Sequence, residues 1–150
     1  MRELVDVRTI PRSRRHPQFV REALAESLRS AGIGYRHEKA LGGFRKPRPE
    51  SPNRAWEHEG FRGYADYMDS DEFREALDRL QRGAEQLPTT VMCAEAQWWR
   101  CHRRLIADAL VIRGWEVLHL PAATPHELTP FAVRGPDNRL TYPPAQTQLL

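Results

Sequence analysis

The stretch that decides the fold runs from Thr90 to Ile112 and reads TVMCAEAQWWRCHRRLIADALVI. Its first three residues form a short apolar segment typical of a buried strand, and apolar residues recur at helical spacing from residue 105 to residue 112. A cysteine between a strand and a helix meets unpaired backbone N–H groups and the positive end of the helix dipole, which stabilise a thiolate or a bound anion. The stretch therefore predicts a strand, a site-bearing loop and a helix.

Strand and helix patterns alternate along the rest of the chain. We expect strands at residues 4–7, 33–37, 90–92 and 115–120, and helices that start at Pro17, Phe61, Asp71 and near Trp98. Between them, residues 41–60 are rich in proline and glycine and predict an irregular loop. This order predicts an α/β fold with a mainly parallel sheet and helices on its faces. We expect a single α/β domain over residues 1–142.

The carboxyl-terminal part has a different composition. It is rich in proline, and two short apolar segments at residues 131–134 and 139–142 flank Gly135-Pro136-Asp137-Asn138. This turn sequence predicts a small hairpin in the extension. Residues 143–150 are expected to form a loose tail.

Two loops follow predicted parallel strands, and they carry most of the candidate site. The carboxyl ends of parallel strands open on the same edge of a sheet, so the arginine loop at residues 8–16 and the loop at Cys93 should meet there. Cys93 is a candidate nucleophile, Glu95 could orient an arginine or move a proton, and Asp6 should anchor Arg8. The candidate catalytic residues are Cys93, Glu95, Cys101 and His102, and the candidate anion-binding residues are Arg8, Arg12, Arg14, Arg36, Arg100 and Arg103. The alternative is that the thiols only pack and the arginines only solvate the surface.

Several short motifs together resemble one known family. They are Val5-Asp6-Val7-Arg8, Gly34-Tyr35-Arg36-His37, Leu41-Gly42-Gly43, Phe61-Arg62-Gly63-Tyr64-Ala65, Cys93-Ala94-Glu95 and Cys101-His102-Arg103. Over residues 4–142 the chain resembles the bacterial and archaeal family catalogued as domain of unknown function 488. The resemblance implies the fold and the location of the site, but no reaction.

The chain departs from that family at its start. Relatives usually carry an extra strand and helix, with a Thr-Ile-Gly-His-Ser type motif, ahead of the Asp-Val-Arg strand. This sequence instead begins at Met1-Arg2-Glu3-Leu4. We therefore expect an exposed sheet edge, which is a route to association.

A looser similarity is architectural. A strand with Asp-x-Arg followed by a strand, a cysteine loop and a helix is similar to rhodanese-type sulfurtransferases and to cysteine phosphatases. A phosphatase loop has five residues between the cysteine and the arginine, whereas six residues separate Cys93 from Arg100. We therefore do not predict a tyrosine phosphatase.

Composition and spacing argue against three classes of protein: disulfide scaffolds, membrane-spanning proteins and zinc proteins. The chain has 150 residues, a net charge of +3 and two cysteines, which are too few for a disulfide scaffold. No apolar run is long enough to span a bilayer, so we expect a cytoplasmic protein without a membrane partner. The spacing of Cys93, Cys101 and His102 matches no common zinc pattern, and we predict no metal and no cofactor. The oligomeric state is not predicted.

Two functions fit these observations. The first is cysteine-dependent chemistry on a small anionic or nucleotide-like substrate in a pocket lined by cysteine and arginine. The alternative is nucleic-acid binding or a repair-associated role without cysteine catalysis, because arginines are interleaved with aromatic residues that stack on bases. Those aromatic residues are Tyr35, Phe44, Trp56, Phe61, Tyr64, Trp98 and Trp99.

Overall fold

The computed structural model describes residues 1–145, and these divide into two compact units. Unit 1 combines residues 1–43 with residues 71–96, and unit 2 combines residues 44–70 with the chain from residue 97 onward. Each unit is assembled from two separate segments, so neither has a single boundary in the sequence. The single domain over residues 1–142 stays a prediction, and the predicted tail lies outside the described residues from residue 146 on.

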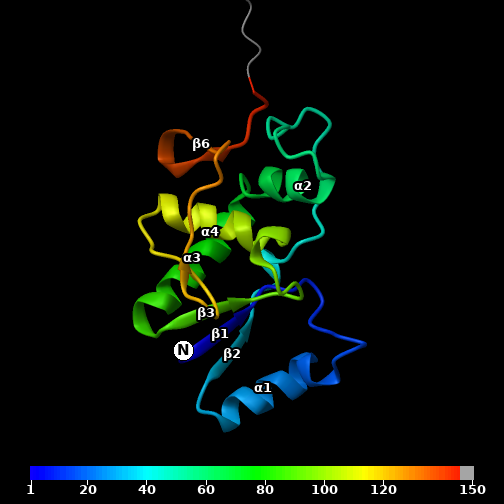
Figure 1. The fold of residues 1–150 in the computed structure, drawn as a ribbon, viewed down its shortest axis with the longest axis vertical. Helices are drawn as coiled ribbons and strands as arrows, with labels where there is room; N and C mark the ends of the chain where they lie inside the picture. Colours follow the sequence, from blue (N-terminus) through cyan, green and yellow to red (C-terminus); the bar gives the residue numbers. More distant parts are fainter. Residues whose placement is uncertain (146–150) are drawn as a thin grey trace, which may run out of the picture. The chain divides into compact units, whose positions relative to one another are not determined.

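Unit 1 is built on a three-stranded parallel sheet (Figure 1). Its strands are β1 (Glu3–Asp6), β2 (Gly34–His37) and β3 (Thr89–Met92), in the order β2-β1-β3. The register places Asp6 opposite both His37 and Met92. The predicted mixed α/β fold with parallel strands is confirmed, and β1 is the central strand. Leu4 and Val5 within β1, and Val7 just after it, are buried because a central parallel strand is covered on both faces.

Two helices cover this sheet on opposite sides, as Figure 1 shows. After a 3₁₀ turn at Pro17–Phe19 (η1), α1 spans Arg21–Ser30 and ends before Gly32, whose φ of +76° is the left-handed conformation that glycine adopts without strain. The helix α3 (Asp71–Gln86) buries Phe73, Ala76, Leu77 and Leu80 along one stripe. A second 3₁₀ turn, η2 (Lys39–Leu41), follows β2.

Unit 2 contains two helices and two small antiparallel pairs of strands. The helices are α2 (Glu59–Tyr67) and α4 (Arg103–Ile112), the latter preceded by a 3₁₀ turn, η3 (Trp98–Arg100). The strands β6 (Val133–Arg134) and β7 (Leu140–Thr141) pair across a fourth 3₁₀ turn at Pro136–Asn138 (η4), which confirms the predicted hairpin. In the described part of the chain, no helix is both long and apolar enough to cross a membrane.

The expected strand at residues 115–120 is wrong as a member of the parallel sheet. Only Leu118–His119 is a strand (β4), and it pairs antiparallel with Thr124–Pro125 (β5) in unit 2. The side chains of Leu118 and Leu120 are 45% and 60% exposed. A strand that faces water on one side does not fit a parallel sheet, whose strands are buried on both faces.

The proline-rich loop ahead of α2 is held by a buried carboxylate. Asp66 of α2 accepts hydrogen bonds from the backbone N–H of Arg48 at 2.8 Å, from the hydroxyl of Ser51 at 2.6 Å and from the amide of Asn53 at 2.7 Å. A Cβ on Gly63 would collide with the backbone carbonyl of Arg45, so this glycine lets the loop lie against the helix. The loop is therefore a fixed part of unit 2.

Candidate functional site

The carboxyl edge of the unit 1 sheet is organised by Asp6 and Arg8. Asp6 is fully buried, and its carboxylate accepts the Nε and Nη2 hydrogens of Arg8 at 2.9 and 2.7 Å. It also accepts the backbone N–H of Arg8 at 3.1 Å, which fixes the turn out of the strand. Asp6 anchors Arg8 as expected, and the guanidinium is engaged by this carboxylate, with only 4% of its side chain exposed.

The neighbouring strand β2 completes this network. The hydroxyl of Tyr35 donates to Asp6 at 2.5 Å, and Nε2 of His37 lies 2.7 Å from the backbone carbonyl of Arg8. Burial raises the pKa of Asp6, but the hydrogen bonds from Arg8 and Tyr35 and the charge of Arg8 outweigh it, so the pKa stays below its ordinary value. Burial and the nearby Asp6 carboxylate raise the pKa of Tyr35 to about 12.

Cys93 follows β3 at the same edge of the sheet. The backbone N–H of Val7 donates to the carbonyl of Met92 at 2.9 Å, so the chain segments that carry Arg8 and Cys93 are adjacent as they leave the sheet. Cys93 is half-buried, its Sγ accepts the backbone N–H of Glu95 at 3.3 Å, and its S–H donates to the Glu95 carbonyl at 3.4 Å. The two loops thus open on one edge, as the parallel topology predicted.

The other predicted residues of unit 1 have different surroundings. Arg12 and Arg14 are exposed on the loop after β1, and the side chain of Glu95 is exposed as well. Arg36 of β2 forms an ion pair with Glu3 of β1 at 3.3 Å, so its charge is partly balanced. Arg12 and Arg14, together with the neighbouring Arg15, therefore supply exposed positive charge on this loop.

The second group of predicted residues belongs to unit 2. Cys101 is buried, its Sγ lies 3.4 Å from Nδ1 of His102, and it accepts the backbone N–H of Arg103 at 3.5 Å. Arg103 is half-buried and Arg100 is exposed. Both cysteines are free. Unit 2 thus contains a thiol–imidazole pair of its own at the start of α4.

Sequence reasoning missed a second hydrogen-bonded constellation, which lies wholly within unit 2. Asp108 of α4 is fully buried, and His126 Nε2 lies 2.7 Å from its Oδ1. The same carboxylate accepts the backbone N–H of Thr129 at 3.0 Å and the hydroxyl of Tyr142 at 2.8 Å. His126 Nδ1 lies 2.9 Å from Nε2 of His119 in β4. One signal was available: Asp108 is a charged residue inside the apolar segment 105–112, and a buried carboxylate requires donors.

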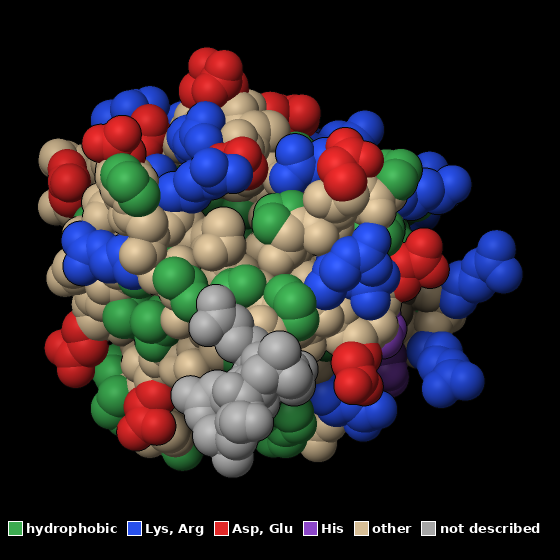
Figure 2. All heavy atoms as spheres, turned by 90° about the horizontal axis from the view of Figure 1, so that it is seen from above, with side chains coloured by type: hydrophobic (Ala, Val, Ile, Leu, Met, Phe, Trp, Pro, Cys, Tyr) green, Lys and Arg blue, Asp and Glu red, His purple; other side chains and the backbone are tan. Residues whose placement is uncertain are grey.

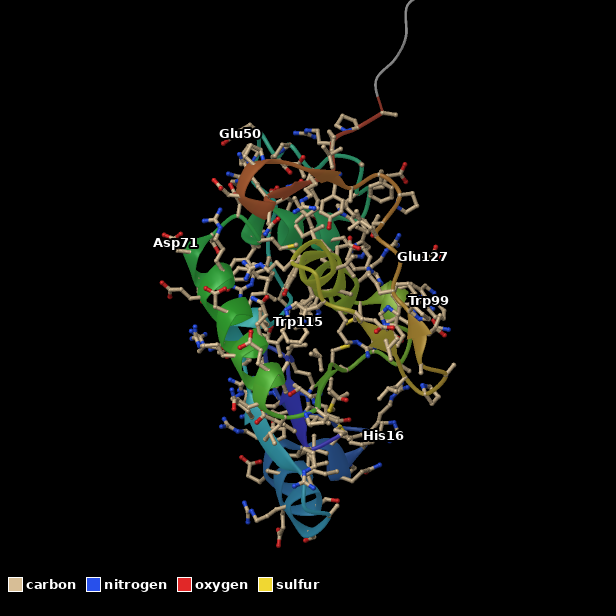
Figure 3. All side chains as sticks on the ribbon, turned by 90° about the vertical axis from the view of Figure 1, so that its left-hand side faces the viewer. His16, Glu50, Asp71, Trp99, Trp115 and Glu127 are labelled. Atoms are coloured by element: carbon tan, nitrogen blue, oxygen red, sulfur yellow. The ribbon has the colours of Figure 1, made fainter. Side chains whose placement is uncertain are left out.

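The aromatic residues that favoured nucleic-acid binding divide into a buried pair, an exposed pair and three part-exposed residues, which are Tyr35, Phe61 and Trp98. Trp56 and Tyr64 are 5% and 1% exposed and belong to the core of unit 2. Phe44 and Trp99 are 90% and 48% exposed, and Figure 3 labels Trp99 at the surface. Stacking on bases is therefore open to the exposed pair rather than to the whole set.

No group of three or more histidine, cysteine, aspartate or glutamate side chains within residues 1–145 is arranged to hold a metal ion.

Comparison with protein-family models shows that residues 1–110 match the model described as domain of unknown function DUF488. The chain belongs to the DUF488 family. Searches of curated proteins and of solved structures find no significant match. The similarity to rhodanese-type folds stays a prediction.

The DUF488 match covers one constellation completely and the other only in part. It includes the sheet edge with Asp6, Arg8 and Cys93, and it also includes Asp108. His119, His126 and Tyr142 lie beyond residue 110. The partners of Asp108 therefore come from chain outside the matched DUF488 segment.

Proposed function

We propose that the carboxyl edge of the unit 1 sheet is a cysteine site for a small anionic or nucleotide-like substrate, with Cys93 as the nucleophile. The observation that supports this most is the backbone N–H of Glu95, which lies 3.3 Å from the Cys93 Sγ. An N–H donor stabilises a thiolate, the reactive form of cysteine, more than it stabilises a thiol. The thiol is also half-buried, so it is not sealed in the core.

Arginines of the adjacent loop would supply the anion recognition. Arg12 and Arg14 are exposed, and exposed guanidinium groups bind phosphate and carboxylate through several N–H donors. Arg8 has a positioning role, because its bonds to Asp6 fix the turn from which this loop continues. A cysteine nucleophile must stay reduced, so the protein would work in a reducing compartment such as the cytoplasm.

The proposed step is a displacement at an electrophilic atom of the substrate. The Cys93 sulfur forms a bond to that atom, and the leaving group departs with the electrons of the bond that breaks. Glu95 is the proposed acid that gives the leaving group its proton and later takes a proton from the water that releases the product. The Cys101–His102 pair of unit 2 is the second candidate for such a step, since its sulfur and imidazole nitrogen are 3.4 Å apart.

The pH dependence of thiol alkylation tests the proposal. Iodoacetamide labelling of the Cys101→Ser variant reports Cys93 alone, and labelling of Cys93→Ser reports Cys101 alone. We expect the labelling rate of Cys93 to rise with a midpoint below about 8.5, the ordinary value for free cysteine. A midpoint at or above that value would remove the activated thiol, and faster labelling of Cys101 would transfer the role to the unit 2 pair.

A second measurement tests the anionic substrate. Inorganic phosphate is expected to slow the labelling of Cys93 in a saturable way, and the variants Arg12→Gln and Arg14→Gln should weaken this protection. Arg29→Gln, at the end of α1, is the matched control and should not change it. Protection that is absent, or that all three variants alter equally, would contradict anion recognition at the sheet edge.

The alternative of nucleic-acid binding is tested with single-stranded oligonucleotides over a salt series. Binding driven by phosphate contacts weakens steeply as salt rises. The face seen in Figure 2 carries basic and acidic side chains intermixed. Tight, salt-sensitive oligonucleotide binding that leaves Cys93 labelling unchanged would favour the alternative.

A further inference from the structure

The Asp108 constellation has the geometry of a directed chain of hydrogen bonds. Asp108 is fully buried, and both of its oxygens are acceptors, Oδ1 for the Thr129 N–H and Oδ2 for the Tyr142 hydroxyl. The nearby His126 Nε2 therefore carries its hydrogen and donates it to Asp108 at 2.7 Å. In a neutral His126 this leaves Nδ1 as an acceptor.

The same reasoning shows which nitrogen of the second imidazole, His119, carries the hydrogen. Since His126 Nδ1 accepts, the Nε2 of His119 at 2.9 Å must be the donor. The lone pair of neutral His119 then lies on Nδ1, and no hydrogen bond to this atom occurs within residues 1–145. The His119 ring is stacked on Trp98 with the centroids 3.9 Å apart and the planes at 4°, so its orientation is also held from the side.

We propose that Asp108, His126 and His119 form a proton relay in unit 2, in which His119 Nδ1 is the general base for a hydroxyl, water or thiol proton of an anionic substrate. A proton taken up at His119 Nδ1 is matched by the passage of the His119 Nε2 hydrogen to His126 Nδ1. The positive charge then rests on His126, which lies beside the Asp108 carboxylate. His119 ends neutral, as the Nδ1–H tautomer.

The electrostatic surroundings explain why the charge should pass to the inner ring. Burial, the nearby His126 and the charge of Arg103 lower the pKa of His119 to about 4, so a charge on its own ring is unfavourable at neutral pH. His126 Nε2 lies 2.7 Å from the fully buried Asp108 carboxylate, so a charge passed to this ring would lie beside a negative group. Protonation thus belongs to the pair of rings rather than to one of them.

The substrate class follows from the charges around His119. Arg103 contributes positive potential at this ring. Arg104 lies beside the Asp108 network instead, with Nε donating to the Thr129 hydroxyl at 3.1 Å and the guanidinium 5.0 Å from the Trp56 ring. A negatively charged substrate is therefore favoured over a cationic one. Asp108 and His126 act through His119 and are positioning residues.

The test is ¹⁵N–¹H NMR of the histidine rings in the full-length protein. At about pH 8 both His119 and His126 should be Nε2–H tautomers, and on acidification toward pH 5 His119 should change to Nδ1–H while His126 becomes the imidazolium. If His119 keeps its Nε2 hydrogen while it titrates, or if His126 never becomes charged, the relay is wrong. Labelling of Cys93 is a separate readout, so failure of the relay and failure of the proposed function can be told apart.

Two variants separate the relay from a purely structural role. His119→Gln can still hydrogen-bond to His126 Nδ1 but has no basic nitrogen, so the protein should fold and no proton should enter the chain of hydrogen bonds at this position. Tyr142→Phe retains the Asp108 carboxylate and should retain the tautomer exchange.

The anionic substrate is tested with inorganic phosphate. At about pH 7, phosphate should shift the His119 resonances, and Arg103→Gln should reduce this shift at least several-fold. Equal shifts in both proteins would overturn the anionic substrate.

Discussion

Asp6 in unit 1 and Asp108 in unit 2 are both fully buried carboxylates, and the difference lies in their partners. Asp6 is paired with an arginine, which stays protonated at every pH at which the protein is folded. Asp108 is paired with a histidine, whose ring can carry its hydrogen on either nitrogen. The Asp6 carboxylate therefore fixes a turn of the backbone, whereas the Asp108 carboxylate can direct the transfer of a proton.

Removing the unit 1 carboxylate should give the largest effect. Asp6→Ala leaves the Arg8 guanidinium buried without its partner, and breaking a buried ion pair in this way costs about 3–5 kcal/mol. Urea unfolding of the variant measures this loss. The control is Asp71→Ala, whose ion pair with Arg74 is on the surface, and it should change stability little. Similar losses in both variants would mean that the Asp6 pair does not hold the sheet edge.

A matched pair of tyrosine substitutions compares the two carboxylates directly. Tyr142→Phe removes a donor to Asp108 from a fully buried position, which should cost about 1.5–3 kcal/mol, as for hydrogen bonds to charged groups. Tyr35→Phe removes a donor to Asp6 from a part-exposed position, where water can replace it, so the loss should be smaller. Urea unfolding decides the order, and a larger loss for Tyr35→Phe would reverse the comparison.

The two regions should also respond to acid in different pH windows. The pKa of Asp6 is below its ordinary value, so the unfolded chain takes up that proton at a higher pH than the folded protein. The stability that Asp6 contributes is therefore present above about pH 4 and is lost as the pH falls further. Asp6→Asn should remove this component, so its unfolding curves should converge with those of the wild type only in strong acid.

His119 should affect the stability of the fold at a higher pH than Asp6 does. Its pKa is lowered from 6.5 to about 4, so between these values the unfolded chain binds a proton that the folded His119 refuses. Stability should therefore decline as the pH falls from 6.5 toward 4, and His119→Gln should flatten this part of the curve. A slope that persists unchanged in the variant would assign the decline to other groups.

The sheet and its site-bearing edge could be predicted because their signals are local. Short apolar segments at Leu4–Val7 and Thr90–Met92 mark strands, and the parallel arrangement alone places the loops after them on one edge. The expectation that residues 115–120 join the same sheet is wrong because an apolar segment does not reveal which strand it pairs with. The partner is β5, a nearby strand of unit 2, and Leu118 is exposed in this pair.

The Asp108 constellation could not be predicted, because it depends on contacts distant in the sequence. His126 lies 18 residues from Asp108, and Tyr142 lies 34 residues away. No periodic pattern connects these positions, so only the tertiary fold shows that they meet. The lone charge within the apolar α4 sequence indicated that partners exist, but not which residues they are.

One spectrum can test the contrast between the two carboxylates directly, because each region contains a reporting histidine. His37 lies 2.7 Å from the carbonyl of Arg8, which can only accept, so its Nε2 hydrogen should remain in place from about pH 8 to pH 5. Over the same range, His119 should exchange its Nε2 hydrogen for one on Nδ1 as His126 becomes charged. If ¹⁵N–¹H NMR shows that His119 keeps its tautomer as His37 does, the proton-directing role of Asp108 is contradicted.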